Sequence, residues 1–411
     1  MQNLYTKSID YLKNRKVFFR KKYIEKIENF SKTWNIVVLE GQRRVGKSYT
    51  ILGFLNYFKI DLKQVFYINK ELDIFDEIQN AKDLEKLFLQ IEKQNSIKYI
   101  IIDEIQNIEK WEKFILEKFT QKKYKIIITW SNSKLLSGEL STLLTWRFLT
   151  INILSFSYRE FLEFKNLENN LENFKEYVKF GWMPEVLLMQ NDDLKKNYIE
   201  NTLNSIFFKD IVSRFTIRNP KLLEKIFQFL QSEVGNLVSI TNIWNYIKNV
   251  FKKEVSLTSI SNYLNYLTFP FLVNEVSRYD IKWKKILDYV SKYYFSDIWI
   301  KNIYGFNFAK DIWAILENLV YLKLIWDGYK VFVWEFSWKE IDFVAEKNWE
   351  KIYIQVCYLL SSEKVIEREF WNLLKIKDNY RKIVVSMDES FGNTYEWIEN
   401  VNILDFLTKN Y

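Results

Sequence analysis

Residues 41–48 constrain the fold of this chain more than any other segment, because they fit the pattern G-x-x-x-x-G-K-S. The segment reads Gly41, Gln42, Arg43, Arg44, Val45, Gly46, Lys47 and Ser48. It follows a β-branched run at 35–39, typical of a buried strand, and precedes a helical pattern at 49–58. In this order, backbone N–H groups and the N-terminus of the helix surround phosphate oxygens. We therefore expect a P-loop on all eight residues that binds the phosphates of ATP.

Two side chains of this loop have expected roles of their own. The Lys47 ammonium would reach the β- and γ-phosphates and take part in catalysis, and the Ser48 hydroxyl would bind Mg²⁺. A chance match to the pattern is the alternative. Chance rarely supplies the strand and the helix on either side as well, so the sequence favours the functional interpretation.

A second apolar run, at 98–102, ends in two carboxylates, Asp103 and Glu104. Such a continuous run is typical of a strand buried on both faces of a parallel sheet. Open α/β sheets bind ligands beyond the carboxyl ends of their strands. We therefore expect Asp103 to bind Mg²⁺ and Glu104 to act as the general base that polarises the attacking water. The alternative is a pair of surface carboxylates after a core strand.

Two further polar residues are candidates for the same site. Asn132 follows a third apolar run, at 124–129, and would sense the γ-phosphate. Arg147 follows residues 144–146 and would stabilise negative charge as a catalytic residue. An ordinary Ser/Asn turn and an ordinary surface arginine are the respective alternatives.

Composition excludes several kinds of chemistry. The chain has no histidine and one cysteine, Cys357, which excludes Ser-His-Asp and Cys-His catalysis and an intrachain disulfide. A structural zinc site is also implausible. No run of about 18 apolar residues occurs, so no transmembrane helix is expected, and a cytoplasmic location fits the absence of a secretory signal. The net charge of +8 is compatible with a nucleic-acid partner and equally with an ordinary solvated surface.

Glycine and tryptophan occur in unusual amounts, with 9 glycines and 15 tryptophans among 411 residues. Trp349 follows Asn348 between two alternating apolar segments, at 340–346 and 351–358, where Asn-Gly is the strongest hairpin signal. We hypothesise that the source reads UGA as glycine, and that most tryptophans except Trp111 are glycine in the natural protein. The alternative is a protein that is rich in tryptophan.

The motifs resemble those of a broad prokaryotic family of AAA-superfamily ATPases with a C-terminal nuclease-like domain. The resemblance lies in residues 41–48, 101–106, 131–140, 153–161, 181–185 and 340–346. The family pattern has glycine where this chain has Trp130, Trp146, Trp182, Trp299, Trp334 and Trp349. The resemblance implies the roles given above for Lys47, Ser48, Asp103 and Glu104, but no defined cellular function.

The expected fold class is α/β, with a parallel-sheet P-loop ATPase core at 1–155. We expect a helical lid at 156–220 and a winged-helix-like region at 221–285, which could bind DNA or a protein partner. Residues 286–411 resemble the restriction-endonuclease-like fold, in which a helix Glu, a strand Asp and an E-x-K motif cluster around Mg²⁺. The corresponding residues would be Glu317, Asp342, Gln355 and Cys357.

This C-terminal region is expected to be inactive as a nuclease. Gln355 supplies no carboxylate to a metal, and Cys357 supplies no ammonium to the transition state. An unrelated α/β region is the alternative. The expected function is that of a slow, Mg²⁺-dependent ATPase that acts as a conformational switch with a nucleic-acid or protein partner. A nuclease gated by ATP, and a non-catalytic adaptor with structural ATP, remain alternatives.

Overall fold

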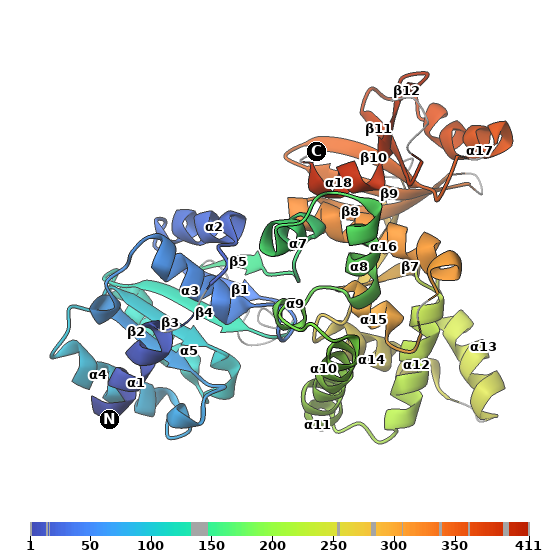
Figure 1. The fold of residues 1–411 in the computed structure, drawn as a ribbon. Helices are drawn as coiled ribbons and strands as arrows, with labels where there is room; N and C mark the ends of the chain where they lie inside the picture. The colour runs from blue at the N-terminus through green and yellow to red at the C-terminus, as the bar shows by residue number, and fades with distance from the viewer. Residues whose placement is uncertain are drawn as a thin grey trace. The chain divides into compact units, whose positions relative to one another are not determined.

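The computed structural model describes the chain apart from residues 1, 14, 16, 133–146, 253–254, 281–284, 306, 337–338, 361, 389–393 and 410–411. The chain divides into two units, Met1–Ile153 and Leu154–Tyr411, which are described here one by one (Figure 1). The expected motif at 133–140 and Trp146 lie outside the described residues. The finer division of residues 156–411 into a lid, a winged helix and a nuclease-like region stays a prediction.

The first unit contains a five-stranded parallel sheet with the order β2-β3-β4-β1-β5. Its strands are β1 Ile36–Glu40, β2 Val65–Asn69, β3 Tyr99–Asp103, β4 Lys125–Trp130 and β5 Phe148–Asn152. Its helices are α1 Gln2–Lys13, α2 Lys21–Ser31, α3 Lys47–Tyr57, α4 Ala81–Glu92 and α5 Trp111–Thr120, with short 3₁₀ turns η1 Leu62–Gln64, η2 Asp73–Phe75 and η3 Ile105–Asn107. The parallel α/β core expected from the sequence is confirmed.

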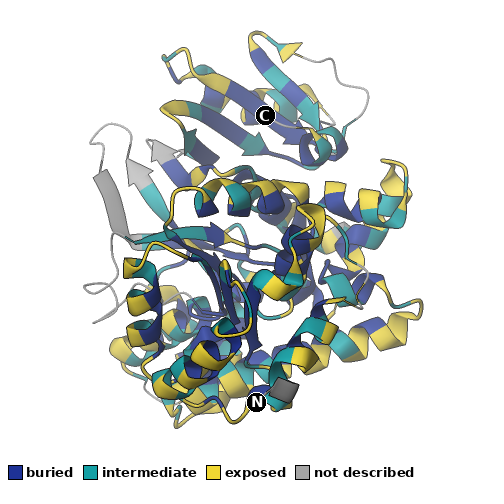
Figure 2. Cartoon of the chain, turned by 90° about the vertical axis from the view of Figure 1, so that its left-hand side faces the viewer, coloured by how far each residue is buried: buried dark blue, intermediate teal, exposed yellow. Residues whose placement is uncertain are grey.

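Helices cover both faces of this sheet, which explains the continuous apolar runs. Successive strand residues point to opposite faces. Ile36 and Val38 of β1 join a hydrophobic cluster with α4 and α5, while Val37 and Leu39 join another with α1, α2 and α3. Strands β1 to β4 are accordingly almost wholly buried, whereas β5 at the edge of the sheet is buried only at Ile151 (Figure 2). This arrangement leaves the carboxyl ends of the strands free to carry polar side chains.

The second unit contains a mixed eight-stranded sheet with the order β12-β13-β11-β10-β9-β8-β6-β7. Its strands are β6 Val273–Asp280, β7 Lys285–Phe295, β8 Lys330–Phe336, β9 Lys339–Lys347, β10 Glu350–Val356, β11 Arg381–Ser386, β12 Thr394–Tyr395 and β13 Ile398–Asn402. β10 pairs antiparallel with β9 and parallel with β11. The expected boundary at 285/286 falls at the first residues of β7, whose hairpin with β6 belongs to this sheet.

Helices precede and flank this sheet. They are α7 Tyr158–Lys165, α8 Leu171–Phe180, α9 Pro184–Leu187, α10 Asp192–Ser205, α11 Ser213–Phe215, α12 Pro220–Ser232, α13 Ile240–Phe251, α14 Leu257–Thr268, α15 Ile298–Asn302, α16 Phe308–Asp327, α17 Glu363–Leu374 and α18 Ile403–Thr408, with the π-helical segment η4 Ile206–Val212. Ser239 caps α13 with a capping box, and the Ser256 hydroxyl caps α14. In the winged-helix-like region, the helices α12, α13 and α14 are followed by the hairpin β6–β7.

Three of the described tryptophans have contrasting surroundings. Trp349 and Asn348 form the two-residue turn between β9 and β10 with φ of 69° and 51°, and Trp349 is 100% exposed. A two-residue turn with positive φ at both positions is the type that favours Asn-Gly. By contrast, Trp130 and Trp182 are buried. Trp349 therefore has a backbone conformation that favours glycine, whereas the indoles of Trp130 and Trp182 fill the core. The recoding of UGA stays a hypothesis.

Candidate nucleotide-binding site

The P-loop of the first unit has a backbone that requires its two glycines. Gly41 has φ of 149°, and a Cβ atom there would lie 2.2 Å from the carbonyl oxygen of Ile153. Gly46 has φ of 90° and is the N-cap residue of α3. L-residues are strained in this left-handed region. Both glycines are therefore needed to turn the chain from β1 into α3 with the backbone N–H groups of the loop at the helix N-terminus.

The Lys47 ammonium lies at the centre of the site. It donates hydrogen bonds to the carbonyl oxygens of Gly41 at 3.0 Å and Gln42 at 3.1 Å. It also donates to the Ser131 hydroxyl at 3.0 Å and lies 3.4 Å from Oε1 of Glu104. The side chain is almost wholly buried. The structure thus brings the P-loop lysine together with the candidate general base.

Asp103 lies next to these groups at the carboxyl end of β3. The Ser48 hydroxyl lies close enough to lower the pKa of the Asp103 carboxyl, so the two expected Mg²⁺ ligands are near each other. The Thr129 hydroxyl donates to Asp103 and accepts the backbone N–H of Glu104 at 2.8 Å. Burial, followed by the negative charge of Glu104, raises the pKa of Asp103 to about 6. A nearby cation would favour its ionised form, so the donor set of hydroxyl and carboxylate oxygens fits Mg²⁺.

Glu104 is held in a strained conformation by several hydrogen bonds. Its φ is 56°, in the left-handed region, and its carboxylate accepts hydrogen bonds from Ser131 and from the Gln106 side-chain amide. Burial raises the pKa of Glu104, but the Lys47 ammonium, the Ser131 hydroxyl and the Arg43 charge lower it more, so the pKa lies below its usual value. Glu104 is therefore ionised at neutral pH. Backbone strain of this kind is frequent at functional positions.

The remaining P-loop residues have distinct surroundings. Arg43 forms an ion pair with Glu71 at 3.0 Å, and Arg44 has φ of 65°. Val45 is part of the hydrophobic core. Gln42 is 2% exposed, and neither polar atom of its side chain has a hydrogen-bond partner among the described residues. Buried polar groups are normally hydrogen-bonded, so these two atoms are available to a ligand.

Two candidates are not brought to the lysine. Asn132 accepts a hydrogen bond from the Trp130 indole at 2.6 Å, and the neighbouring Ser131 contacts Lys47 instead. Arg147 accepts the backbone N–H of Ile36 at 2.7 Å, which places it at the amino end of β1, at the edge of the sheet opposite the P-loop. The expected roles of both residues, in sensing the γ-phosphate and in stabilising negative charge, stay predictions. The indole of Trp130 packs against Trp111 in the core, with 5.8 Å between ring centroids.

Sequence reasoning missed three residues that organise the site: Ser131, Thr129 and Gln106. Thr129 carries the clearest signal, because it is a hydroxyl at the end of the apolar run Ile126–Ile128. A polar residue at that end of a parallel strand lies beside the ends of the neighbouring strands. The contribution of Ser131 instead of Asn132 depends on which side chain the turn directs to Lys47, which the sequence pattern does not specify.

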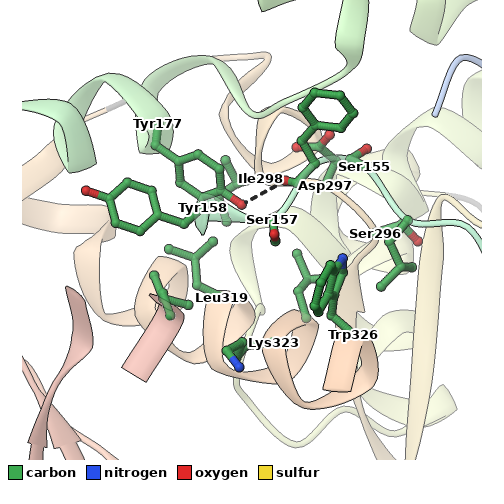
Figure 3. Close-up of a pocket in the computed structure, with 14 residues that line it drawn as sticks. Ser155, Ser157, Tyr158, Tyr177, Ser296, Asp297, Ile298, Leu319, Lys323 and Trp326 are labelled. Atoms are coloured by element: carbon green, nitrogen blue, oxygen red, sulfur yellow. Dashed lines mark hydrogen bonds between the residues drawn. The ribbon is translucent and has the colours of Figure 1, made fainter. Parts of the chain in front are cut away.

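The second unit has a small cavity beside Asp297, shown in Figure 3. Its volume is about 30 Å³, enough for a single water molecule. Asp297 accepts the backbone N–H of Trp182 at 3.1 Å, and burial raises the pKa of this carboxyl to about 6. The Tyr177 hydroxyl donates to the carbonyl of Phe156 at 3.2 Å (dashed line in Figure 3). Asp297 and Tyr177 thus bond to the protein itself, and the cavity is too small for a nucleotide.

The expected nuclease-like residues are also placed in the second unit. Glu317 lies on α16, Asp342 on β9 and Gln355 on β10. Asp342 accepts the backbone N–H of Val356 at 2.8 Å, and the Gln355 amide donates to Glu369 at 3.2 Å. Cys357 is fully buried in a hydrophobic cluster. Among the described residues, no group of three or more His, Cys, Asp or Glu side chains is arranged to hold a metal ion.

Comparison with known proteins identifies the family. A protein of Haemophilus influenzae, named only as uncharacterized, is 32% identical over 400 residues, which cover 94% of this chain and 98% of that protein. The chain belongs to the same family as this protein. Another member, an uncharacterized protein of Methanocaldococcus jannaschii, is 31% identical over 411 residues. The matched region covers 93% of this chain and 88% of that protein. In the present chain, residues 33–162 match the AAA domain family. The first unit is therefore a P-loop ATPase domain of the AAA type.

Residues 171–303 of this AAA-type protein match a domain of unknown function (DUF8612). The second match covers only the first residues, 286–303, of the expected nuclease-like region at 286–411, and the identity of that region stays a prediction. Among solved structures, a Walker-type ATPase of Pyrococcus abyssi is 16% identical, with a TM-score of 0.48, and covers 71% of this chain and 99% of that one. DnaA of Aquifex aeolicus with bound AMPPCP is 16% identical, with a TM-score of 0.32, and the match covers 62% of this chain and 90% of the DnaA chain. In the described part of the chain, no helix is long and apolar enough to cross a membrane.

Proposed function

We propose that this protein binds ATP with Mg²⁺ at residues 41–48 and hydrolyses it slowly, as a conformational switch. The observation that carries the proposal is the contact of Lys47 with Glu104 and with the carbonyl groups of its own loop. A P-loop lysine binds the β- and γ-phosphates, so Lys47 would exchange Glu104 and the loop carbonyls for phosphate oxygens when the nucleotide binds. The same exchange frees the Glu104 carboxylate. Binding would thus be coupled to the conformation of the catalytic carboxylate.

The remaining roles follow from the donors at the site. Ser48 and Asp103 would hold Mg²⁺, which when bound supplies positive charge to the phosphate oxygens. Glu104, ionised at neutral pH, would accept a proton from the attacking water. Ser131 would keep both Lys47 and Glu104 in place. The buried amide of Gln42 supports the proposal, because a ligand would supply the hydrogen bonds that it lacks among the described residues.

Calorimetry with Lys47→Ala tests the ATP site. We expect the variant to lose tight ATP binding, because the loop then lacks the cation for the β- and γ-phosphates. Lys86→Ala, which removes an exposed lysine from α4, is the matched control and should bind ATP as the wild type does. Unchanged affinity in Lys47→Ala would contradict the site. Binding of ATP by the wild type without any turnover would instead favour the non-catalytic adaptor.

We also propose that residues 221–285 bind the partner of the switch. The order α12, α13, α14 and hairpin β6–β7 agrees with a winged helix, which serves DNA or protein recognition. Exposed Lys248 and Lys252 at the end of α13 favour DNA, because they add positive charge beside α14. Fluorescence anisotropy with duplex DNA tests this, with Lys248→Ala as the weakened variant and Lys86→Ala as the control. Salt-independent or absent binding would favour a protein partner.

A further inference from the structure

A buried lysine lies inside a group of carboxylates in the second unit. Lys292 of β7 has a side chain that is 1% exposed. Its ammonium lies 2.7 Å from Oε1 of Glu317, 3.4 Å from Oδ1 of Asp342, and in contact with Glu340. The three carboxylates come from α16 and β9. One ammonium is thus the shared counter-ion of three acidic side chains.

The surrounding structure holds this arrangement in place. Glu340 and Asp342 are two residues apart on β9 and therefore point to the same face of the sheet. The Tyr294 hydroxyl donates to Glu317 at 2.6 Å, and the backbone N–H of Val356 donates to Asp342 at 2.8 Å. A Cβ atom at Gly235, where φ is 83°, would lie 2.5 Å from Glu317. Glu317 and Asp342 are therefore held by groups other than the lysine.

The electrostatic balance keeps Lys292 charged. Burial lowers the pKa of a lysine, but the charges of Glu317, Asp342 and Glu340 more than offset it, so the pKa lies above its usual value. Replacing one partner of a buried charge network normally leaves an uncompensated buried charge, which is strongly unfavourable. The carboxylates therefore need a cation, and the chain itself provides it.

Carboxylate oxygens that converge on one point are the usual surroundings of a divalent cation. Here the point is taken by the ammonium, although solvent has access. A cavity of about 650 Å³ is lined by Glu340, Asp342 and Gln355, and the Glu340 side chain is 35% exposed. The carboxylates that a nuclease-like metal centre would use, Glu317 and Asp342, thus come together around a lysine. These residues do not fit Mg²⁺ in the chain as it stands.

We propose that the Lys292 ammonium occupies the position of a divalent cation among Glu317, Glu340 and Asp342, and that removal of Lys292 creates a metal site there. The chain itself takes up no Mg²⁺ or Mn²⁺ at this place. The proposal does not depend on the ATP site of the first unit. It gives a structural cause for the expected lack of nuclease activity, which is an internal cation where a metal would have to bind.

Titration of the full chain with Mn²⁺, followed by electron paramagnetic resonance without nucleotide, tests this. We expect Lys292→Ala to bind one Mn²⁺ more than the wild type, and the double variant with Asp342→Asn to lose that ion. Lys301→Ala is the matched control, because it removes a partly buried lysine whose ion pair among the described residues is with Asp311, at 2.9 Å. It should bind no additional ion. Circular dichroism and thermal unfolding verify that each variant is folded.

Two results would overturn the proposal. The first is a folded Lys292→Ala variant without the additional Mn²⁺. The second is Mn²⁺ bound by the wild type and lost in Asp342→Asn, which would mean that the metal coexists with the lysine. If Lys292→Ala does not fold, Lys292→Met retains the length of the side chain without its charge. If that variant also fails, the comparison of the wild type with Asp342→Asn decides, and equal Mn²⁺ binding by the two supports the proposal.

Discussion

Glu104→Gln separates the binding of ATP from its hydrolysis. The amide keeps the size of the side chain and its hydrogen-bond acceptor, but it cannot take a proton from water. General-base catalysis contributes about 10²- to 10⁴-fold, so turnover should fall by that factor. The backbone of Glu104 and its contacts with Ser131 and Gln106 remain available to the amide, so the fold should be kept.

The same substitution should tighten ATP binding. Glu104 is 4% exposed, and its carboxylate lies 3.4 Å from the Lys47 ammonium that phosphates require. Two unit charges about 4 Å apart attract by about 4 kcal/mol at an effective dielectric constant of about 20, desolvation offsets much of this energy, and a neutral amide retains part of the rest. A loss of about 1–2 kcal/mol from this competing contact corresponds to a gain in ATP affinity of roughly 5- to 30-fold. The removal of a negative charge near the phosphates acts in the same direction.

Calorimetry gives the affinity, and phosphate release gives the turnover. The matched control is Glu109→Gln, which changes an exposed carboxylate after η3 and should leave both quantities unchanged. Turnover at the wild-type rate in Glu104→Gln would refute the general-base assignment. Reduced turnover with unchanged affinity would refute the reasoning that Glu104 holds Lys47 away from the nucleotide.

Three further results are expected. Thr129→Val removes the hydroxyl that links Asp103 to Glu104, and it should lower both the free energy of unfolding, by about 1–3 kcal/mol, and the rate of ATP turnover. Urea unfolding measures the first quantity and phosphate release the second. Thr129→Ser keeps the hydroxyl and should retain both. Trp349→Gly should stabilise the protein by about 1 kcal/mol, because an L-residue in the left-handed region is strained by about 1–2 kcal/mol. Trp349→Ala keeps the Cβ atom and should give no such gain, so equal melting temperatures of the two variants would contradict the strain argument. Burial raises the pKa of Asp297 to about 6 in the folded state. Between the ordinary pKa of an aspartate and about pH 6, the folded state therefore binds more protons than the unfolded state. The free energy of unfolding should accordingly decline as the pH rises through that range. Urea unfolding across this pH range should show the decline in the wild type and not in Asp297→Asn. Identical pH profiles of the two proteins would contradict the assignment of the decline to Asp297.

Local sequence predicted much of the first unit because its signals are short-range. The apolar runs before Gly41 and before Asp103 form two strands of the same parallel sheet, β1 and β3, with β4 between them. Two glycines with positive φ made the P-loop recognisable, since no other residue tolerates the conformation without strain. The turn at Asn348 and Trp349 was likewise predicted from the alternating segments on either side.

Other features depend on where side chains far apart in the sequence come together. Arg147 stands next to the first strand, but at its amino end, because β5 runs parallel to β1 and starts level with Ile36. Ser131 contacts Lys47 from 84 residues away, and its neighbour Asn132 bonds to an indole instead. Sequence spacing could suggest a polar turn there, but not which of the two side chains faces the lysine.

By itself, the sequence determined that the chain has a P-loop, two carboxylates at the end of a buried strand, and no histidine for catalysis. These conclusions need only the backbone preferences of a few adjacent residues and the periodicity of burial. Only the tertiary structure decided which cation neutralises Glu317, Glu340 and Asp342. The sequence gives Lys292 no distinguishing pattern, because its role arises from strand pairing and helix packing that bring α16, β7 and β9 together. Electrostatic interactions in a buried cluster depend on distance in space, and the order of residues along the chain does not specify that distance.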